Sequence, residues 1–493
     1  LQASKQSGRT FKIQEIPYEW PKNIKNIHNY KIGFDPKLFT NNTLERYFEK
    51  KVNLIPIEFK FENIIRYKES RIFQLNASVT GESFFSKINR IKKYMNKSNI
   101  NYLYSSASEN NNWLLNIRGK DLPNSPLVNC KAIISNKGKI YLFINSKKIS
   151  LSVKKYLKNI IIYNEDSLFN VIRNLKKGFF CIDKNTCSIF EKGIIESKFN
   201  IIHYNDPIYE LKSLKNNIEI KNTIKAHIED GVALTKFLFW FKTHKAKISE
   251  KKIENKLEYF RKKSKNYLYP SFDTIAGSGP NGAIIHYKST NKTNRNLKKN
   301  DVLLLDSGGQ YRWGTTDVTR TTSRGKVSID IKNKFTRVLK GHIAVINCDL
   351  KKNSSGYLID RLARIYLNEV GLDYSHGTGH GVGFFLNVHE GPQGITKFNR
   401  IKLAEGMILS NEPGFYKEGK FGIRIENLLY IKKEKRKLMF KNLTLAPIEK
   451  DLINFNRLNN DEKNYLFNYH LEVYTKISKY LNGDEKKWLA SHI

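Results

Sequence analysis

The chain has 493 residues, 40% of them hydrophobic and 12% aromatic, which is enough for several folded domains and excludes the disordered class. Its formal net charge is +40, from 86 Lys and Arg against 46 Asp and Glu. No stretch approaches the roughly 20 apolar residues that cross a bilayer, and four scattered cysteines without a CxxC pair disfavour a disulfide scaffold or a zinc–cysteine site.

The excess positive charge has two interpretations. A nucleic-acid site gathers its basic side chains in one place and interleaves them with aromatic ones. Here the runs KKNSS, KKEKRK and NLKKN are short and dispersed, and lysine, asparagine and isoleucine are abundant throughout. We therefore expect compositional drift, with only weak and non-specific adhesion to nucleic acid. A specific polyanion site is the alternative.

The first stretch, LQASKQSGRTFKIQEI, has no apolar core behind a basic flank, so it does not predict a secretion signal. Together with the scattered cysteines, this predicts a cytoplasmic protein that does not engage a membrane. The chain does not begin with methionine, which leaves open whether it is a fragment or a processed form.

Residues 1–70 contain two short strand-like stretches, KIGFDP and VNLIPIEF, which are too little for a complete domain. Residues 71–206 alternate between helical and strand-like patterns, which predicts a compact α/β domain. In this domain FFSKINRIKKYMNKSNI favours a helix. KAIISNKGKIYLFIN predicts a hairpin, because SNKG is a turn signal between two apolar runs.

The pattern changes in residues 207–493. About 30 residues that begin at YELKSLKNN have helical periodicity. Strands and glycine-rich turns dominate residues 271–430, with helical patterns at KNKFTRVLKGHIAVINC and SSGYLIDRLARIYLNEVG. The final stretch NNDEKNYLFNYHLEVYTKISKYL opens on Asn and Asp, which are good N-cap residues, and predicts a helix. We expect domain boundaries near residues 70 and 207.

Two stretches of this last domain place acidic residues in the same plan. In DVLLLDSGGQYRWGTTDVTRT an apolar run ends at Asp306, a glycine-containing turn follows, and a second run begins at Asp317. In GMILSNEPGFYKEGKFGIRIENLLYI, Glu412 ends one run and Glu426 lies in the next. A single acid at a strand end is commonly a turn cap or a salt-bridge partner, because an unpaired buried carboxylate is costly. Four acids predict one cleft, in which two divalent cations would relieve their repulsion.

A histidine-rich segment accompanies these acids. HGTGHGVGFFLNVHEGP, residues 376–392, contains three histidines and five glycines. Oxygen ligands with one imidazole suit a hard or borderline cation such as Mn²⁺ better than a thiolate site would. The glycines indicate that the segment crowds against something small.

Several stretches together resemble one family. IIHY, DSGGQYRWGTTDVTRT, HGTGHGVG, NVHEGP, SNEPGFY and GIRIEN are similar to the signature stretches of aminopeptidase P, the Xaa-Pro aminopeptidases. NNNWLLNIRG is similar to the middle-domain motif of the long, three-domain members. The resemblance implies an α/β (α+β) fold with a pita-bread catalytic domain and helical tail at residues 207–493. Two creatinase-type domains would precede it, a truncated one at residues 1–70 and a second at residues 71–206.

The resemblance also implies a set of metal ligands for two divalent ions, most simply Mn²⁺. They are Asp306, Asp317, His380, Glu412 and Glu426. Glu412 would in addition be the general base for a metal-activated water.

The same resemblance implies substrate-side residues, namely His286, His376, His389 and Arg424. His389 would hydrogen-bond the peptide carbonyl or the charge that develops on it. Arg424 has an equally good interpretation as the ion-pair partner of a ligating carboxylate.

The implied activity is removal of the N-terminal residue from a peptide whose second residue is proline, by a homodimeric enzyme. Prolidase and methionine aminopeptidase share the fold and are the nearest alternatives. A third possibility, from a different class, is a non-catalytic nucleic-acid-binding module of this fold. Such modules lose metal ligands, whereas this chain keeps all five.

The chain departs from the family at two points. Its first domain is much shorter, and the acidic pair before the middle-domain Trp is here Glu109 followed by Asn110.

Trp313 and Phe384 have two interpretations, as pocket lining or as ordinary packing. The histidines that match no family motif are expected to be ordinary core or surface residues: His203, His227, His244 and His342.

Overall fold

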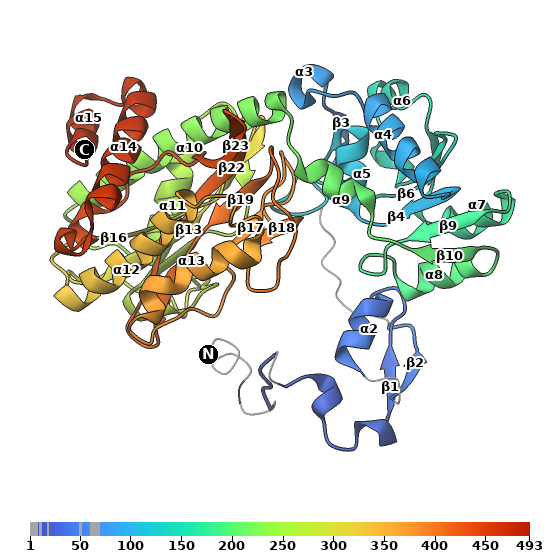
Figure 1. The fold of residues 1–493 in the computed structure, drawn as a ribbon, viewed down its shortest axis with the longest axis horizontal. Coiled ribbons are helices and arrows are strands. Elements are labelled where there is room, and N and C mark those ends of the chain that lie inside the picture. The colour runs from blue at the N-terminus through green and yellow to red at the C-terminus, as the bar shows by residue number, and fades with distance from the viewer. Residues whose placement is uncertain (1–7, 9–11, 17–18, 49–51, 60–69) are drawn as a thin grey trace. The chain divides into compact units, whose positions relative to one another are not determined.

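The computed structural model describes residue 8 and residues 12–16, 19–48, 52–59 and 70–493. The chain divides into two compact units (Figure 1). The first comprises residues 1–123 and 127–211, and the second comprises residues 124–126 and 212–493. The expected boundary near residue 70 adjoins residues 60–69, which lie outside the described ranges. A separate first domain therefore stays a prediction.

The first unit begins with a small parallel pair of strands, β1 (Lys31–Phe34) and β2 (Asn53–Pro56), joined through helix α2 (Asn41–Tyr47). Thr40 caps this helix, because its hydroxyl accepts a hydrogen bond from the Thr43 amide. Both strands lie in the two stretches that the sequence predicts as strand-like.

A six-stranded mixed sheet forms the centre of the first unit, in the order β10-β9-β4-β6-β7-β8. Its strands are β4 (Tyr102–Ser105), β6 (Lys131–Ser135), β7 (Ile140–Phe143), β8 (Ile161–Tyr163), β9 (Phe179–Ile182) and β10 (Asn200–His203). The predicted hairpin is confirmed: β6 and β7 are antiparallel, and Gly138 adopts a φ of 85° in the turn between them. A smaller antiparallel pair joins β3 (Phe73–Gln74) and β5 (Ile117–Arg118).

Further helices accompany this sheet along the chain. They are α3 (Ala77–Thr80), α4 (Phe84–Lys97), α5 (Ser108–Leu115), α6 (Leu151–Tyr156), α7 (Leu168–Asn174), α8 (Ile189–Glu196) and α9 (Pro207–Ser213). Of these, α5 packs against β4 and β6, and α8 packs against β10. The predicted helix is α4, which Ser83 caps and which buries Phe84, Ile88, Ile91 and Met95 at helical spacing.

The departure at the middle-domain motif has a local explanation. Asn110 donates a 2.9 Å hydrogen bond to Asp206, whose carboxylate is buried and also accepts from Ser105. A second acid at position 110 would face that carboxylate and repel it. The retained Glu109 accepts a 2.7 Å hydrogen bond from the Tyr209 hydroxyl.

The second unit contains two antiparallel strand pairs of the same plan. β13 (Val302–Ser307) pairs with β16 (Val318–Ser323), and β19 (Ile408–Asn411) pairs with β22 (Asn427–Glu434). The two runs that flank each turn in the sequence are therefore neighbouring strands. What the sequence indicates as a glycine-containing turn is in each case a short hairpin, whose strands of two to four residues are too short to show a periodic pattern. These hairpins are β14 (Gly309–Tyr311) with β15 (Gly314–Thr315), and β20 (Gly414–Lys417) with β21 (Phe421–Arg424).

The other strands of the second unit extend these pairs into larger sheets, in the orders β11-β14-β15, β12-β13-β16 and β18-β17-β19-β22-β23. Their bounds are β11 (Tyr267–Pro270), β12 (Ile275–Ser278), β17 (Gly379–Gly381), β18 (Glu390–Ile395) and β23 (Lys437–Asn442).

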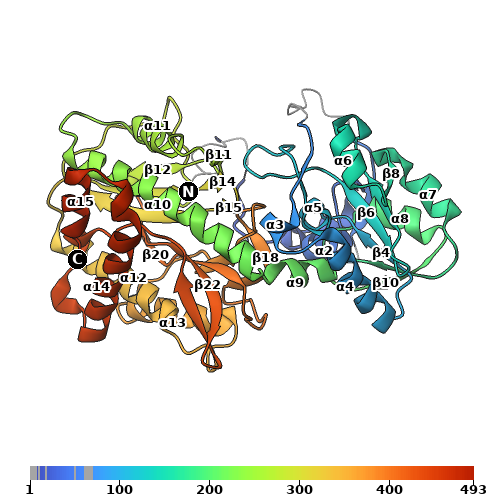
Figure 2. The same cartoon turned by 90° about the horizontal axis from the view of Figure 1, so that it is seen from above.

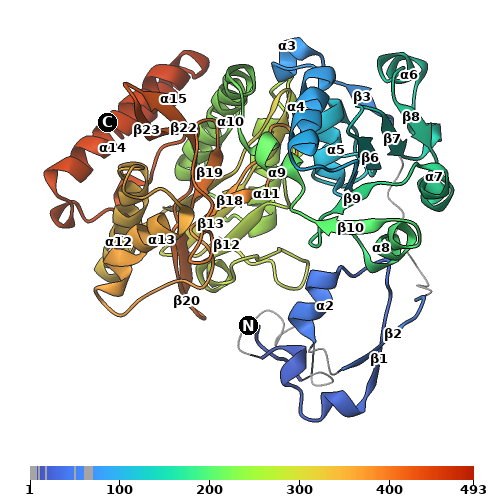
Figure 3. The ribbon, with the colours of Figure 1, turned by 45° about the vertical axis from the view of Figure 1, so that its right-hand side comes forward.

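Helices flank the sheets of the second unit: α10 (Asn217–Thr243), α11 (Glu250–Arg261), α12 (Ile329–Ile346), α13 (Gly356–Asn368), α14 (Asn460–Ile477) and α15 (Gly483–Ala490). Helix α10 lies beside α14 and α15 (Figure 2), and α12 lies beside α13 (Figure 3). The predicted helices at α12, α13 and α14 are confirmed. No helix in the described part of the chain is long and apolar enough to cross a membrane.

The long helical stretch expected from YELKSLKNN is interrupted. Helix α9 ends at Ser213 and α10 begins at Asn217. The side chain of Asn216 accepts hydrogen bonds from the Ile218 and Glu219 amides, and the Glu219 carboxylate accepts one from the Asn216 amide. This capping box starts a new helix inside a periodic pattern.

Candidate metal and peptide site

A cavity of about 560 Å³ lies in the second unit. All nine residues that the sequence analysis assigns to the site line it: His286, Asp306, Asp317, His376, His380, His389, Glu412, Arg424 and Glu426. Their roles as ligands or substrate contacts stay predictions, but the chain brings them together from positions up to 140 residues apart.

The two nested strand pairs deliver the four acids. Asp306 lies near the end of β13, opposite Thr319, and Asp317 directly precedes β16. Glu412 directly follows β19, and Glu426 directly precedes β22, next to the paired residues Asn411 and Asn427. Each pair thus presents one acid where a strand ends and one where its partner begins.

Histidine 380 faces the acids with a free lone pair. Its Nδ1 lies 2.9 Å from the Gly381 carbonyl, which can only accept, so Nδ1 carries the proton in the neutral ring. Its Nε2 lies 3.5 Å from Asp317 Oδ2 and 3.5 Å from Glu412 Oε1. Ligand atoms of Asp317, His380 and Glu426 all lie within 4.8 Å of one another. Three acceptors around one point suit a cation.

The carboxylates are crowded enough to need such a cation. Burial, with the charges of Asp306 and Glu412, raises the pKa of Asp317 well above its ordinary value. Burial, with the charges of Asp317 and Glu412, does the same to the pKa of Glu426. Asp306 Oδ1 is buried without a hydrogen-bond partner among the described residues. Divalent ions would satisfy that oxygen and offset the repulsion, so the residues present fit a metal centre.

Arg424 is held inside the protein by three hydrogen bonds that its guanidinium donates. Nη2 donates to Asp306 Oδ2 at 2.6 Å, Nη1 to the Tyr416 hydroxyl at 2.7 Å, and Nε to Thr319 Oγ1 at 3.1 Å. Thr319 in turn donates to Glu426 Oε2 at 2.9 Å. The ion pair with a predicted ligand is therefore present, and contact of Arg424 with substrate stays a prediction.

His376 also lines the cavity, but both of its ring nitrogens have partners in the protein. Nδ1 lies 2.8 Å from the Gly377 carbonyl, and Nε2 lies 2.8 Å from the Tyr416 hydroxyl. Because Tyr416 already accepts from Arg424, its hydroxyl proton is free to go to His376 Nε2. Burial, with the charge of Arg424, lowers the pKa of His376 to about 3, which agrees with a neutral ring.

His286 and His389 are the histidines that remain available to a ligand. Both are exposed at the cavity, and neither ring has a hydrogen-bond partner among the described residues. The His389 ring meets that of His380 edge-on, with centroids 4.1 Å apart. Burial, with the charge of His380, lowers the pKa of His389 to about 4. A neutral His389 beside the acids can donate one N–H to a substrate oxygen.

The glycines of the histidine-rich segment crowd against the protein itself. A Cβ on Gly379 would lie 2.0 Å from the Ser410 carbonyl oxygen on β19. Glycine therefore allows the strand that carries His380 to approach the strand that leads to Glu412.

Three residues that support the site were not predicted from the sequence. Tyr416 and Thr319 join Arg424 to the acids; Thr319 lies two residues after Asp317, on the same face of the strand, which was the available signal. Glu390 forms a buried ion pair with Lys212, at 3.1 Å, and another with Lys215, and it directly follows His389. Pairing over this sequence distance leaves no local signal.

The remaining residues lie elsewhere. Trp313 packs edge-on against Phe385, with centroids 5.3 Å apart, and Phe384 is buried; neither lines the cavity. The four histidines without a motif are also outside its lining: His203, His227, His244 and His342.

Three family models match successive parts of the chain. Residues 221–433 match metallopeptidase family M24, residues 66–219 match the creatinase/prolidase N-terminal domain, and residues 436–493 match the C-terminal region of peptidase M24. The probable Xaa-Pro aminopeptidase P of Laccaria bicolor is 35% identical, over 99% of this chain and 82% of its own length. This chain belongs to the aminopeptidase P family. Another relative, Xaa-Pro aminopeptidase 1 of Dictyostelium discoideum, is 34% identical to this aminopeptidase P homologue over 100% of the chain and 85% of its own length.

Solved structures show the same relationship. The X-prolyl aminopeptidase of Caenorhabditis elegans, a cytosolic enzyme with a di-nuclear active site, superimposes with a TM-score of 0.87 at 30% identity. The match covers 94% of this chain and 80% of the C. elegans chain. The Xaa-Pro dipeptidase of Bacillus anthracis shares the fold, with a TM-score of 0.60 at 22% identity over 74% of this chain and 99% of its own. The fold predicted for this aminopeptidase P member, creatinase-type and pita-bread domains, is therefore confirmed.

Proposed function

We propose that this chain is a metal-dependent Xaa-Pro aminopeptidase, which hydrolyses the bond between an N-terminal residue and a following proline. The observation that carries the proposal is the convergence of four acids and His380 in one cavity beside two unpaired histidines. The names of the relatives, and the di-nuclear centre of the C. elegans enzyme, support it.

Two divalent ions, with Mn²⁺ favoured, would be held by five side chains: Asp306, Asp317, His380, Glu412 and Glu426. When bound, such ions make a water nucleophilic near neutral pH and polarise a carbonyl. Oxygen ligands with a single imidazole match the preference of manganese.

The protein's own residues would handle the proton and the developing charge. Glu412 would accept the proton of the attacking water, because its carboxylate faces the cavity beside His380. His389 would donate to the oxygen of the scissile carbonyl, and His286 would contact the peptide from the same side. His376 would act through Tyr416 and Arg424.

The substrate's chemistry separates this cleavage from that of an ordinary peptide bond. A residue–proline bond is a tertiary amide without an N–H, so a site that relied on that donor would fail. Peptides with proline second would be the substrates. A cytoplasmic homodimer is the proposed setting, which the cytosolic relative supports for the location.

The test compares Arg-Pro-Pro, an Arg-Pro dipeptide and a Met-Ala peptide after dialysis against a chelator, with no added metal, with Mn²⁺ or with Mg²⁺. We expect release of arginine from Arg-Pro-Pro to depend on metal and to recover better with Mn²⁺ than with Mg²⁺. Cleavage of the dipeptide alone would indicate a prolidase, and cleavage of Met-Ala would indicate a methionine aminopeptidase. Full activity after verified removal of metal would contradict the proposal.

A further inference from the structure

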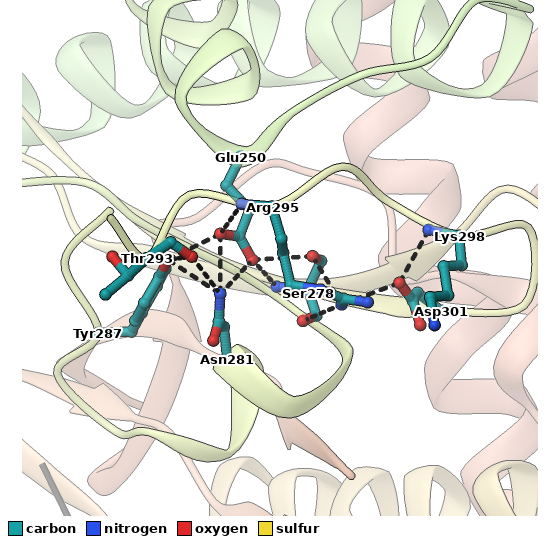
Figure 4. Close-up of polar contacts among 8 residues, drawn as sticks. All are labelled: Glu250, Ser278, Asn281, Tyr287, Thr293, Arg295, Lys298 and Asp301. Atoms are coloured by element: carbon teal, nitrogen blue, oxygen red, sulfur yellow. Dashed lines mark hydrogen bonds and ion pairs between the residues drawn. The ribbon is translucent and has the colours of Figure 1, made fainter. Parts of the chain in front are cut away.

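A fully buried carboxylate outside the cavity organises one of its walls. Glu250 begins helix α11, and its side chain is 0% exposed. Oε1 accepts from the Ser278 amide and hydroxyl, both at 2.8 Å, and Oε2 accepts from the Tyr287 hydroxyl at 2.7 Å and the Arg295 amide at 3.2 Å. Asn281 Nδ2 lies 3.1 Å from Oε1 and 3.0 Å from Oε2. Figure 4 shows these donors converging on the carboxylate.

All of these donors come from one segment, residues 278–295. A carboxylate buried without donors would be costly, whereas this one is satisfied by main-chain and side-chain groups and lies at a helix N-terminus. The segment's conformation is therefore built around the charge of Glu250. Removing a donor leaves a buried charge less satisfied, and removing the charge leaves several donors without their acceptor.

The same segment forms a wall of the cavity. Residues 285–288 all line it, while the Tyr287 hydroxyl reaches Glu250 and the residue as a whole is only 4% exposed. His286 has no hydrogen bond of its own among the described residues. Its position therefore depends on the backbone on either side, and the neighbouring anchor is Tyr287.

Further contacts close the segment on itself. Arg295 Nη1 donates to the Ser278 carbonyl at 2.6 Å and pairs with Asp301 at 2.9 Å (Figure 4). The Thr293 carbonyl lies 3.0 Å from the Tyr287 hydroxyl and 3.1 Å from Asn281 Nδ2. A Cβ on Gly422 of β21 would lie 1.8 Å from the Gly282 carbonyl oxygen, so the turn η5 (Gly279–Ala283) is seated directly on that strand. These contacts hold the ends of the segment, and the Tyr287–Glu250 bond holds its middle.

We propose that Glu250 and Tyr287 are positioning residues, which fix His286 against the substrate through the bond between the Tyr287 hydroxyl and the Glu250 carboxylate. This inference rests on the proposed peptidase function. A purely structural role would stabilise the fold without acting through His286. A positioning role predicts a different result. Removal of the Tyr287 hydroxyl should then slow the reaction only in a chain that still has His286, because His286 is the group that the loss would misplace.

The test is a double-mutant cycle of Tyr287→Phe and His286→Ala, read as kcat/KM on Arg-Pro-Pro with metal content and Tm alongside. Tyr287→Phe keeps the ring and removes only the hydroxyl. We expect it to lower kcat/KM about 10-fold with unchanged metal content, since a misplaced group costs about this much or more. In the His286→Ala background the same change should lower kcat/KM less than about 2-fold, because the two effects are coupled.

A matched control is another tyrosine hydroxyl that donates to a glutamate of helix α11. The Tyr267 hydroxyl donates to Glu258 on α11 at 2.5 Å, but β11, which carries Tyr267, contributes no residue to the cavity lining. Tyr267→Phe should therefore lower Tm without changing kcat/KM. If Tyr287→Phe changed kcat/KM equally in both backgrounds, or not at all, the positioning role would be wrong. An unsubstituted chain without activity on Arg-Pro-Pro would instead overturn the proposed function, so the two failures are distinguishable.

Discussion

Arg424 Nη2 donates a 2.6 Å hydrogen bond to Asp306 Oδ2, while Asp306 Oδ1 is buried and has no partner among the described residues. The arginine thus orients the carboxylate and leaves one oxygen for a cation. Arg424 also donates to Tyr416, which contacts His376, and to Thr319, which contacts Glu426. One guanidinium therefore connects these two hydroxyl groups to the predicted ligand Asp306. A lysine ammonium is a point charge that cannot reproduce this planar fork.

We therefore expect Arg424→Lys to weaken metal affinity or activity about 10–100-fold, the usual cost of losing a residue that orients a ligand. Metal titration and kcat/KM on Arg-Pro-Pro would measure this. Arg337→Lys is the control, because neither Arg337 nor its ion-pair partner Glu369 lines the cavity. If Arg424 contacts the substrate instead, KM would rise while metal affinity stayed unchanged.

Replacement of the two neighbouring histidines should separate substrate from metal. His389→Ala should keep its metal and lose about 10²–10³ in rate, the cost of one transition-state donor. His380→Ala should lose both metal and activity, because its Nε2 faces Asp317 and Glu412. Metal stoichiometry beside turnover, for each purified variant, is the measurement. Emptying of the site by His389→Ala, with His380→Ala still loaded, would reverse the assignment.

The predicted general base has its own test. Glu412→Gln keeps the size of the side chain and one oxygen but cannot accept a proton. Its turnover should therefore fall further than its metal content. A proportional loss of both would mean that Glu412 serves as a ligand only.

Half-buried Glu254 predicts a pH dependence of stability. Burial, with the charge of Glu250, raises the pKa of Glu254 from 4.5 to about 7, and its Oε1 has no partner among the described residues. The folded state then holds a proton that the unfolded state has released between these two pH values, so this contribution to stability is lost as pH rises through that window. Glu254→Gln should raise Tm at pH 8 and leave it nearly unchanged at pH 4.5.

Thermal unfolding at both pH values measures this effect, with the exposed Glu418→Gln as the control. An equal change of Tm at both pH values would show that the carboxylate is charged in the folded state throughout, and the predicted shift would be wrong.

The net charge of +40 should produce only weak binding to nucleic acid. The lysines are dispersed, so phosphate contacts would be sequence-independent and would weaken steeply with salt. Fluorescence anisotropy with two unrelated oligonucleotides, at 50 mM and 200 mM salt, would measure both properties. Tight binding at the higher salt, or a preference for one sequence, would indicate a dedicated basic surface.

The sequence by itself determined which residues gather at the cavity and the strand plan of the second unit. Acids at the ends of apolar runs, as at Asp306 and Glu412, indicate a site locally, because a buried carboxylate is costly unless it has a partner. Strong helical periods, such as that of α12, and the turn between β6 and β7 are also local and appear as predicted. The family motifs are ordered stretches of the same kind, which is why they identify nine cavity residues.

Only the tertiary structure decided what supports those residues. Tyr287 and Glu250 are 37 positions apart, so their partnership leaves no pattern in the chain. The sequence offered an ion pair between Arg424 and a ligating carboxylate as one of two interpretations, and only the structure shows that the partner is Asp306, 118 positions away. The same holds for the protonation state of His376, which depends on a hydroxyl 40 residues away that Arg424 has already engaged. Local patterns specify which groups must be buried. The donors that satisfy them are set by strand pairing and packing over long sequence distances, because hydrogen bonds depend on proximity in space and not in sequence.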